Sequence, residues 1–303
     1  MLPYASMAEA EAALGRSLTT SEAVWFHYSA RMPDYILFFH NLFCLLIAYT
    51  LAPLPLTFLE LFHPSSIASY KIQPKVRHPP ASIFQCYKRV VTTFVLALSP
   101  LLLVSYPIMK LTGIRTGLPL PSTGEMVAQL VVYVLAEDYV SYWLHRFMHG
   151  KWAYENIHHV HHELTAPFGF AVAHAHWLEI LLHGIPTIVG PVLAPGHIIT
   201  FFIWTIIRQV EAIDNHCGYD FPLNPLKYIP FYGGPEYHDY HHYIGGQTRS
   251  NFATIFTYCD YIYGTNKGYR YHKARQTKLL EQWRSTGQNG EFNATDFDDD
   301  KSD

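Results

Sequence analysis

Long apolar runs alternate with polar, proline-rich stretches through the first two-thirds of the chain. Five runs are mainly apolar, and they cover residues 35–61, 90–111, 126–144, 177–193 and 197–210. A helix needs about 20 mostly apolar residues to cross a hydrocarbon layer roughly 30 Å thick, and these runs approach that length. Pro195 and Gly196 predict a tight turn between the last two runs. The pattern predicts an all-α integral membrane protein, a helical bundle of about four to five membrane segments.

The composition supports a membrane environment. Of the 303 residues, 16% are aromatic and 15% are charged, whereas about 25% of an average soluble domain is charged. A buried helix of a soluble protein is the alternative for any single run, and five runs together favour the membrane. The formal net charge is −3, and the sequence has no lysine- and arginine-rich tract interleaved with aromatic residues. We therefore expect no nucleic acid partner.

Basic residues predict which side of the membrane the loops occupy. Lys71, Lys75, Arg77, Lys88 and Arg89 crowd the connection between the first two runs, and basic loops stay in the cytosol. If the second and third runs cross out and back, and the last two form a hairpin, the histidine motifs described next return to the same side. We expect a multi-pass protein with these motifs facing the cytosol.

Histidines are concentrated in one part of the chain. Fourteen of the 19 histidines lie between residues 145 and 242, in three motifs: HRFMH at 145–149, HHVHH at 158–162 and HDYHH at 238–242. Residues at i, i+3 and i+4 of a helix share a face, so the imidazoles within each motif should converge on one side. The converging residues are His145, His149, His158, His161, His162, His238, His241 and His242. His159 points elsewhere.

Converging imidazoles indicate a metal site. Neutral imidazole is the commonest metal ligand, and histidines crowded together without metal would repel one another on protonation. A tetrahedral zinc ion accepts four ligands, so this many imidazoles predict two ions. For one motif alone, an ordinary surface pair is the alternative; three motifs in series favour metal. Imidazole suits iron, copper, nickel and zinc, so the ligand type leaves the metal open.

Further residues are candidates for the same site. His216 follows the predicted hairpin and returns to the face that carries the motifs, so we expect it to be a ligand. His176 is another candidate ligand, and a better one than His174. Asp138 lies on the same helical stripe as His145, and its carboxylate would orient an imidazole N–H. Other carboxylates that could do so are Glu163, Glu179, Glu211 and Asp239.

The series H-x-x-x-H, H-x-x-H-H and H-x-x-H-H resembles the fatty acid hydroxylase superfamily of membrane di-iron oxygenases. The resemblance covers roughly residues 125–272. Within it, four segments are similar to the sterol 4α-methyl oxidases (methylsterol monooxygenases) of the plant type: TAPFGFAVAHAHWLEILLHGIPTIVGP, RQVEAIDNHCGYDFP, KYIPFYGGPEYHDYHHYIGGQ and FTYCDYIYGTNKGYRY. Fatty acid hydroxylases in general would not be expected to share these long aromatic-rich segments.

The resemblance implies a particular chemistry. It implies O2-dependent oxidation of a sterol 4α-methyl group to alcohol, aldehyde and carboxylate, in the endoplasmic reticulum membrane. The implied cofactors are two iron ions, with electrons from NAD(P)H through cytochrome b5 or a related donor. Iron fits because an unactivated C–H bond needs an oxidant that redox-inactive zinc cannot supply. The implied partners are the sterol substrate, membrane lipid, cytochrome b5 or its reductase, and a sterol C4-decarboxylase complex.

Matched motif by motif, the resemblance also implies the metal ligands. They are His145, His149, His158, His161, His162, His216, His238, His241 and His242, with His176 at the position of a further family histidine. His174 stands where a non-histidine residue is expected.

The chain divides into four predicted regions. Residues 1–34 form an N-terminal segment, and residues 35–123 contain membrane helices and the basic cytosolic loop. Residues 124–272 form a fatty acid hydroxylase-like catalytic domain, which includes a cytosolic, histidine-rich di-metal cap. Residues 273–303 form a polar, acidic tail that we expect to be disordered.

Two other functions remain open from the sequence. A hydroxylase of fatty acyl chains or sphingoid bases would use the same metal centre on a different substrate. A non-catalytic metal-binding scaffold of a sterol-synthesis complex would bind metal without turnover. Product analysis on sterols and ceramides separates the first alternative, and loss of activity in His161→Ala would exclude the second.

Overall fold

Helices and their connecting loops make up the part of the chain that the structure describes. The structure is a computed structural model, and it describes residues 2–243 and 250–285. Within these residues it contains no β-strand, only three isolated bridges between loops. The predicted all-α fold class is confirmed for this part of the chain.

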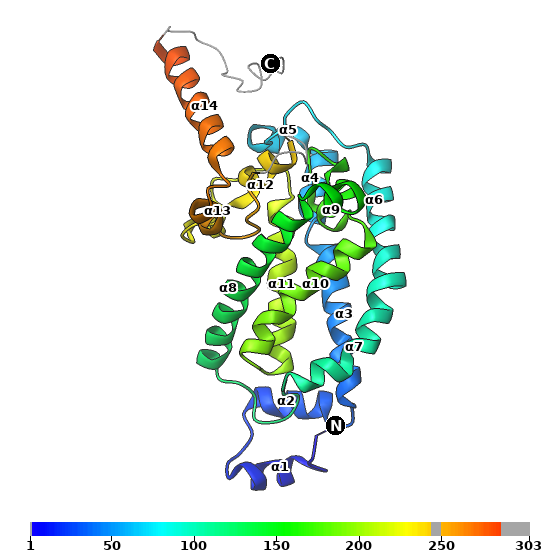
Figure 1. Cartoon of the computed structure of the whole chain (residues 1–303). Helices are drawn as coiled ribbons and strands as arrows, with labels where there is room; N and C mark the ends of the chain where they lie inside the picture. The colour runs from blue at the N-terminus through cyan, green and yellow to red at the C-terminus, as the bar shows by residue number, and fades with distance from the viewer. Residues whose placement is uncertain (1, 244–249, 286–303) are drawn as a thin grey trace.

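The long helices stand side by side as an upright bundle (Figure 1). They are α3 (Asp34–Leu51), α6 (Pro80–Thr93), α7 (Ser99–Leu111), α8 (Thr123–Met148), α10 (Trp177–Leu193) and α11 (Ile198–Asn215). A short π-helix, η2 (Phe94–Leu98), joins α6 to α7. Each of the five predicted apolar runs therefore lies in helical structure, and α10 and α11 are joined by the short turn at residues 194–197, as predicted.

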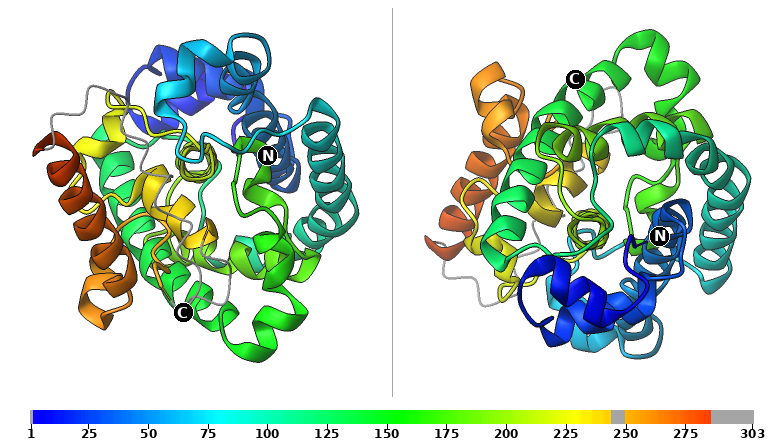
Figure 2. Two further views of the ribbon diagram at one scale, coloured as in Figure 1. Left: turned by 90° about the horizontal axis from the view of Figure 1, so that it is seen from above. Right: turned by 90° about the horizontal axis from the view of Figure 1, so that it is seen from below.

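Shorter elements close the two ends of the bundle. The N-terminal helices α1 (Met7–Leu14) and α2 (Thr20–Ser29) lie at one end. The cap at the other end contains α4 (Leu54–Phe62), α5 (Pro64–Ile67), η1 (Ala68–Tyr70), α9 (Lys151–Asn156), η3 (His158–Glu163), η4 (Gly169–Ala173), η5 (Pro225–Tyr228), α12 (Gly234–Tyr243) and α13 (Tyr258–Tyr263). The longer helix α14 (Lys267–Ser285) follows the cap. Seen along the bundle axis, α12 lies over the middle of the bundle (Figure 2).

Close helix packing builds the bundle core. Helix α10 packs along α8, and α11 packs along α3. At the first contact, a Cβ added to Gly190 would lie 2.5 Å from the Cα of Tyr133, so only glycine permits this approach. Tyr133 also packs edge-on against Trp204 of α11 and donates its hydroxyl to the carbonyl of Ala194. Together these contacts fix α8, α10 and α11, the helices that carry His145, Glu179 and His216.

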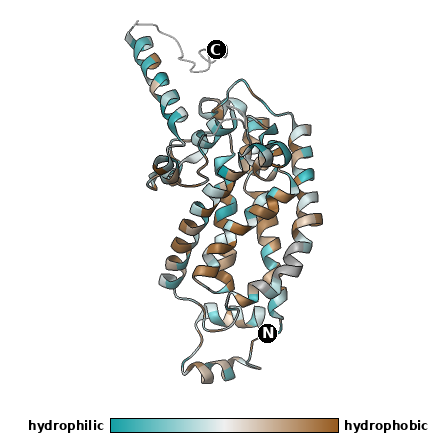
Figure 3. Ribbon diagram, viewed as in Figure 1, coloured by the Kyte–Doolittle hydropathy of each residue, from teal (hydrophilic) through white to brown (hydrophobic). Residues whose placement is uncertain are grey.

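Helix α8 is apolar on its outer face and polar on its inner face. An exposed apolar or aromatic side chain recurs at every fourth position: Val127, Val131, Leu135, Tyr139 and Trp143. The buried face carries Gln129, Glu137, Asp138, Ser141 and His145. A surface helix of a soluble protein has the opposite arrangement. Figure 3 shows the apolar residues along the bundle helices and the hydrophilic ones in the cap and α14.

The helical segment Asp34–Phe62, which comprises α3 and α4, is long and apolar enough to cross a membrane. It is the one such segment among the described residues, and its most apolar stretch has a mean hydropathy of 2.0 and is 17% buried. Helix α10 is apolar but has 17 residues. The number of membrane segments beyond Asp34–Phe62 therefore stays a prediction.

The C-terminal region differs in part from the expectation of a disordered tail. Residues up to Ser285 form helix α14, which has no buried residue and extends away from the cap (Figure 1). Residues 286–303, which hold the acidic end of the sequence, lie outside the described residues. The polar composition after residue 272 is thus compatible with an exposed helix. A helix that packs against no other element does not need an apolar face.

Candidate metal centre

Nine buried histidines gather in two clusters where the cap meets the bundle. The first cluster contains His145, His149, His158, His162 and His241, and the second contains His161, His216, His238 and His242. Within each cluster, one nitrogen from every ring lies within 4.8 Å of all the others. The most exposed of the nine residues is 8% exposed. Both clusters are therefore closed to bulk water.

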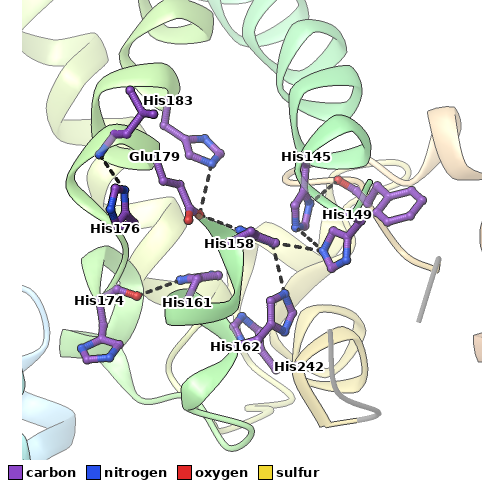
Figure 4. A network of polar contacts seen from close by, with 12 residues as sticks. His145, His149, His158, His161, His162, His174, His176, Glu179, His183 and His242 are labelled. Carbon is purple, nitrogen blue, oxygen red and sulfur yellow. Dashed lines mark hydrogen bonds and ion pairs between the residues drawn. The ribbon is translucent and has the colours of Figure 1, made fainter. Parts of the chain in front are cut away.

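Four elements deliver these side chains. Helix α8 ends at the first motif, with His145 in its last turn and His149 as its C-terminal cap. The second motif forms η3, the third lies on α12, and His216 caps the end of α11. Figure 4 shows several of these rings turned toward one another from their separate elements. The site therefore depends on contacts between residues up to about a hundred positions apart.

The Nε2 atoms point inward in both clusters. In the first, Nε2 of His149 lies 3.3 Å from Nε2 of His145 and 3.0 Å from Nε2 of His158. In the second, Nε2 of His216 lies 3.3 Å from Nε2 of His161 and 3.0 Å from Nε2 of His238. Each cluster thus presents a set of converging nitrogen atoms, the donor arrangement that a transition-metal ion requires.

The two H-x-x-H-H motifs divide between the clusters, contrary to the expectation from their spacing. We expected the three imidazoles of each motif to share one side. Instead, His161 joins the second cluster while its neighbour His162 joins the first, and His241 joins the first while His242 joins the second. Consecutive residues of a helical turn point in directions about 100° apart, so adjacent histidines can reach different centres. Each of these motifs therefore contributes to both clusters.

Backbone carbonyl groups fix the tautomer of four rings. The Nδ1–H groups of His145, His161, His216 and His241 donate to the carbonyl oxygens of Phe252 (2.9 Å), His174 (3.2 Å), Ala212 (2.8 Å) and Ser250 (2.7 Å), respectively. A carbonyl oxygen only accepts, so in each neutral ring the proton sits on Nδ1 and Nε2 carries a lone pair. These carbonyls prepare the rings to bind metal through Nε2.

His161 and His216 provide the most direct indication of a cation. Both rings hold their proton on Nδ1, so the two Nε2 atoms face each other at 3.3 Å with a lone pair on each and no hydrogen between them. Two facing lone pairs repel, and a positive ion between them removes the repulsion. The donor set therefore fits a bound metal ion at each cluster.

Protonation does not offer another solution, because the site disfavours charged imidazole. Burial, together with repulsion from neighbouring imidazoles, holds the pKa values of His161, His238 and His242 well below 6.5. Burial also lowers the pKa of His216 to about 4. The rings are therefore neutral near pH 7, which is the form that binds metal.

A carboxylate contacts the first cluster directly, but it is Glu179 and not Asp138. Glu179, in the first turn of α10, lies 2.8 Å from Nδ1 of His158 and is 2% exposed (Figure 4). Its Oε1 is also 3.8 Å from Nε2 of His183. Glu179 was one of several carboxylates expected from the sequence, and no local pattern distinguishes it from the others.

Asp138 contacts backbone amides in place of an imidazole. Its Oδ1 accepts the N–H groups of Ile255 (3.0 Å) and Phe256 (2.9 Å). Asp260, which the sequence analysis missed, accepts the N–H groups of Phe252 and Ala253 in the same loop. Because Phe252 supplies the carbonyl that orients His145, the two aspartates position that histidine through the loop.

Three of the other histidines singled out in the sequence lie outside both clusters. The ring of His176 caps α10 by accepting the N–H of Leu178, so the structure does not bring this candidate ligand to either cluster. The ring of His174 contacts Glu163, and its carbonyl orients His161. His159 is exposed, as expected. His174 thus acts through its backbone, for which sequence gives no signal.

A cavity of about 290 Å³ joins the clusters to the bundle interior. Apolar side chains from four helices line it: Leu45, Val90, Ile180, Ile188 and Phe201. Rings of both clusters reach it, including His145, His158, His161, His216 and His238. An apolar chamber with a few polar groups at one end is typical of a site for a mostly apolar small molecule.

Comparisons with known proteins agree with this geometry. Residues 130–265 match the fatty acid hydroxylase family. The chain is 59% identical over 297 residues to Very-long-chain aldehyde decarbonylase GL1-10 of Oryza sativa subsp. japonica, covering 98% of this chain and 99% of that protein. It is 59% identical over 284 residues to Methylsterol monooxygenase 1-1 of Arabidopsis thaliana, covering 93% and 94%, respectively.

A more distant relative and the solved structures complete the comparison. Methylsterol monooxygenase 2-2 of Arabidopsis thaliana is 43% identical over 222 residues, which is 73% of this chain and 82% of that protein. No solved structure matches the chain. The chain belongs to the fatty acid hydroxylase family, alongside the plant methylsterol monooxygenases, as the family match, the 59% identity to Methylsterol monooxygenase 1-1 over 93% of this chain and the two histidine clusters show.

Proposed function

We propose that this protein is a membrane-bound di-iron oxygenase that oxidises the C4 methyl group of sterols to alcohol, aldehyde and carboxylate. The observation that carries the proposal is the double cluster of inward-facing imidazoles, with the lone pairs of His161 and His216 opposed at 3.3 Å. Relatives at 56–59% identity bear the name methylsterol monooxygenase, which supports the sterol C4 methyl group as the target.

Each cluster would hold one iron ion. The first ion would be bound by His145, His149, His158, His162 and His241, and the second by His161, His216, His238 and His242. When bound, the irons supply the capacity to activate O2 for attack on an unactivated C–H bond, which zinc cannot provide. The protein's own contribution is to fix the tautomers of the rings, to exclude water, and to hold the substrate beside the clusters.

The distribution of apolar side chains supports a membrane location. The exposed stripe on α8 and the exposed apolar segment at residues 34–62 would face lipid. The bundle would span the endoplasmic reticulum membrane with about four to five segments, and the histidine clusters would lie at its cytosolic face. Residues 124–272 would form the catalytic domain, and residues 35–123 would complete the membrane bundle.

The cavity supports a mostly apolar substrate. A sterol is an apolar ring system with one hydroxyl group, and it would reach the cavity from the bilayer. Its methyl group must come close to both clusters, and the cavity is lined by rings from both. Electrons would come from NAD(P)H through cytochrome b5 or a related donor on the cytosolic side, and a sterol C4-decarboxylase complex would act on the carboxylate product.

Sterol profiling in yeast tests this proposal. A strain lacking its own C4-methyl oxidase would receive the intact chain, His161→Ala or the exposed neighbour variant His159→Ala. We expect loss of 4-methyl sterols with the intact chain and with His159→Ala, and accumulation with His161→Ala. Unchanged 4-methyl sterols despite good expression of the intact chain would refute the proposal. Activity retained in His161→Ala would show that the oxidation does not depend on the second cluster, and would refute the role proposed for it.

A second candidate function rests on the rice relative named as a very-long-chain aldehyde decarbonylase, which shares 59% identity. The same centre could also serve a hydroxylase of fatty acyl chains or sphingoid bases. Supplying the purified protein in turn with a 4-methylsterol, a very-long-chain aldehyde and a ceramide separates these activities. We expect product from the sterol alone. Product from the aldehyde or the ceramide would instead assign the protein the activity on that substrate.

A further inference from the structure

Glu179 has one carboxylate oxygen that the metal site does not use. Its Oε1 accepts the Nδ1–H of His158 at 2.8 Å. Its Oε2 is buried and has no hydrogen-bond partner among the described residues. The residue is 2% exposed and lines the cavity beside the clusters. A buried acceptor without a partner is unfavourable, so this oxygen is suited to a donor that arrives with the substrate.

The chemistry of the proposed substrate requires a polar contact in this place. The inference rests on the proposed function, in which the reacting methyl group is bonded to C4 of the sterol. The sterol's hydroxyl group is on C3, the adjacent ring carbon. When the methyl group is held beside the metal centre, the hydroxyl group must also lie beside the metal ligands. The residue that binds it must therefore be in contact with the ligand shell.

Glu179 meets this requirement, and the other acidic residue of the cavity does not. Glu137 also lines the cavity, is 2% exposed and has an Oε2 without a hydrogen-bond partner among the described residues, but its Oε1 is paired with Arg208. It precedes His145 by eight residues on α8, which places it about 12 Å away along the helix axis. Glu179, in contrast, is hydrogen-bonded to a histidine of the first cluster.

We propose that Glu179 accepts a hydrogen bond from the 3-hydroxyl group of the sterol, and so determines which methyl group lies at the metal centre. The unpartnered Oε2 can accept the hydrogen of a hydroxyl group. A 3-keto oxygen cannot donate a hydrogen bond, so it leaves Oε2 without that partner. The single polar group of the substrate thus sets its register in an otherwise apolar cavity.

Equilibrium binding to the full-length, metal-loaded protein tests this inference. Affinities for a 4-methylsterol and its 3-keto analogue would be measured by competition with a fluorescent sterol, without oxygen so that no turnover occurs. We expect the wild type to prefer the 3-hydroxyl ligand by about tenfold to a hundredfold. Equal affinities in the wild type would overturn the inference without any variant, so it stays testable even if a variant fails to fold.

Glu179→Gln gives the more specific result. Its amide oxygen can still accept from His158, while its NH2 group now donates into the cavity and can bind the keto group. We expect this variant to lower the hydroxyl-to-keto preference by about tenfold or to reverse it. Equal weakening of both ligands would mean that Glu179 only orients His158, and would reject the inference. Metal content, measured in parallel, reports on that orienting role.

Two further variants complete the design. Glu137→Gln changes a carboxylate in the same cavity, and we expect it to leave the hydroxyl-to-keto ratio unchanged. Thr254→Val removes a buried cavity hydroxyl that has no hydrogen-bond partner among the described residues. If either variant, and not Glu179→Gln, lowers the ratio, the hydroxyl subsite lies elsewhere. Methyl oxidation by a wild type that shows no preference would leave the proposed function standing while this inference fails.

Discussion

Asp138 accepts the backbone N–H of Ile255 at 3.0 Å, and this bond links the helix that carries His145 to the loop that orients His145. The carbonyl of Phe252, three residues earlier in that loop, accepts the Nδ1–H of the same histidine. Asp138 is 1% exposed, so the bond is shielded from water. A position of the metal site is therefore determined by a carboxylate that touches no metal ligand directly.

Replacing Asp138 should weaken both the fold and the metal site. Asp138→Ala leaves the amides of Ile255 and Phe256 without an acceptor, so we expect the free energy of unfolding to fall by about 1–3 kcal/mol. Asp138→Asn keeps the acceptor oxygen, but a neutral amide accepts more weakly than a carboxylate, so this variant should retain the fold and lose part of its metal. Thermal unfolding and metal analysis of both variants check this. Unchanged metal content in Asp138→Asn would remove Asp138 from any role at the site.

Adjacent histidines should affect different metal ions. His161→Ala should empty the second cluster and His162→Ala the first, because each removes an imidazole from one cluster. We expect each variant to lose at least half of the bound metal and to lower activity by more than about 100-fold. His159→Ala, the exposed neighbour, should keep both. Metal analysis with a spectroscopic measure of iron–iron coupling distinguishes the cases, and full metal content in His162→Ala would contradict the assignment.

Two glycines of α10 should respond in opposite ways to the same change. A Cβ at Gly190 would lie 2.5 Å from the Cα of Tyr133, whereas a Cβ at Gly184 meets nothing within 4 Å. We expect Gly190→Ala to lower the free energy of unfolding by about 1–3 kcal/mol, and Gly184→Ala to leave it equal or slightly higher. Thermal melting in detergent measures both. Similar melting temperatures would argue against the close α8–α10 contact.

The N-terminal helices should become less stable in acid. Arg16 donates two hydrogen bonds to Glu22, and with the bonds from Thr19 they lower the pKa of Glu22 to about 2. Because the unfolded carboxyl group takes up its proton near pH 4.5, the stability that this pair contributes is complete above that pH and is lost as the pH falls toward about 2. Amide hydrogen exchange in α2 should therefore accelerate over this range. In Glu22→Gln the acceleration should disappear, and its persistence would assign the effect to another group.

Replacing iron with zinc should preserve the stability of the fold and abolish methyl oxidation. The imidazole ligands suit both metals, so we expect the zinc-loaded protein to melt near the same temperature as the iron-loaded protein. It should show no methyl oxidation, because zinc has no accessible redox change. Oxidation by a zinc-loaded, iron-free preparation would show that the reaction does not depend on a redox metal.

The sequence predicted the elements and most of the candidate ligands, because both follow from local patterns. Apolar runs of membrane length became helices. The histidine spacing selected eight residues and the predicted hairpin added His216, and these nine gather in space. Contacts between distant segments could not be predicted in the same way. The contact of Glu179 with His158 joins residues 21 positions apart, and the bonds of Asp138 join residues 117 and 118 positions apart.

Orientation was harder to predict than proximity. The i, i+3, i+4 rule brought each H-x-x-H-H motif to the site but assigned its three rings to one side. The large angle between consecutive side chains of a helical turn, which the rule ignores for adjacent histidines, sends neighbouring rings of η3 and α12 to different clusters. His176 is a second example of an orientation that the sequence did not predict. It lies close in sequence to the ligand motifs, but its ring accepts the N–H of Leu178 and caps a helix.

The division of the motifs means that covalently joined residues tie the two clusters together. His161 and His162 are neighbours in the chain, as are His241 and His242, and each pair reaches across from one centre to the other. Adjacent Cα atoms are held about 3.8 Å apart by the planar peptide between them, whatever the surrounding helices do. A motion of the bundle helices that widens or narrows the substrate cavity would therefore not carry the backbone of one cluster away from that of the other at these two points.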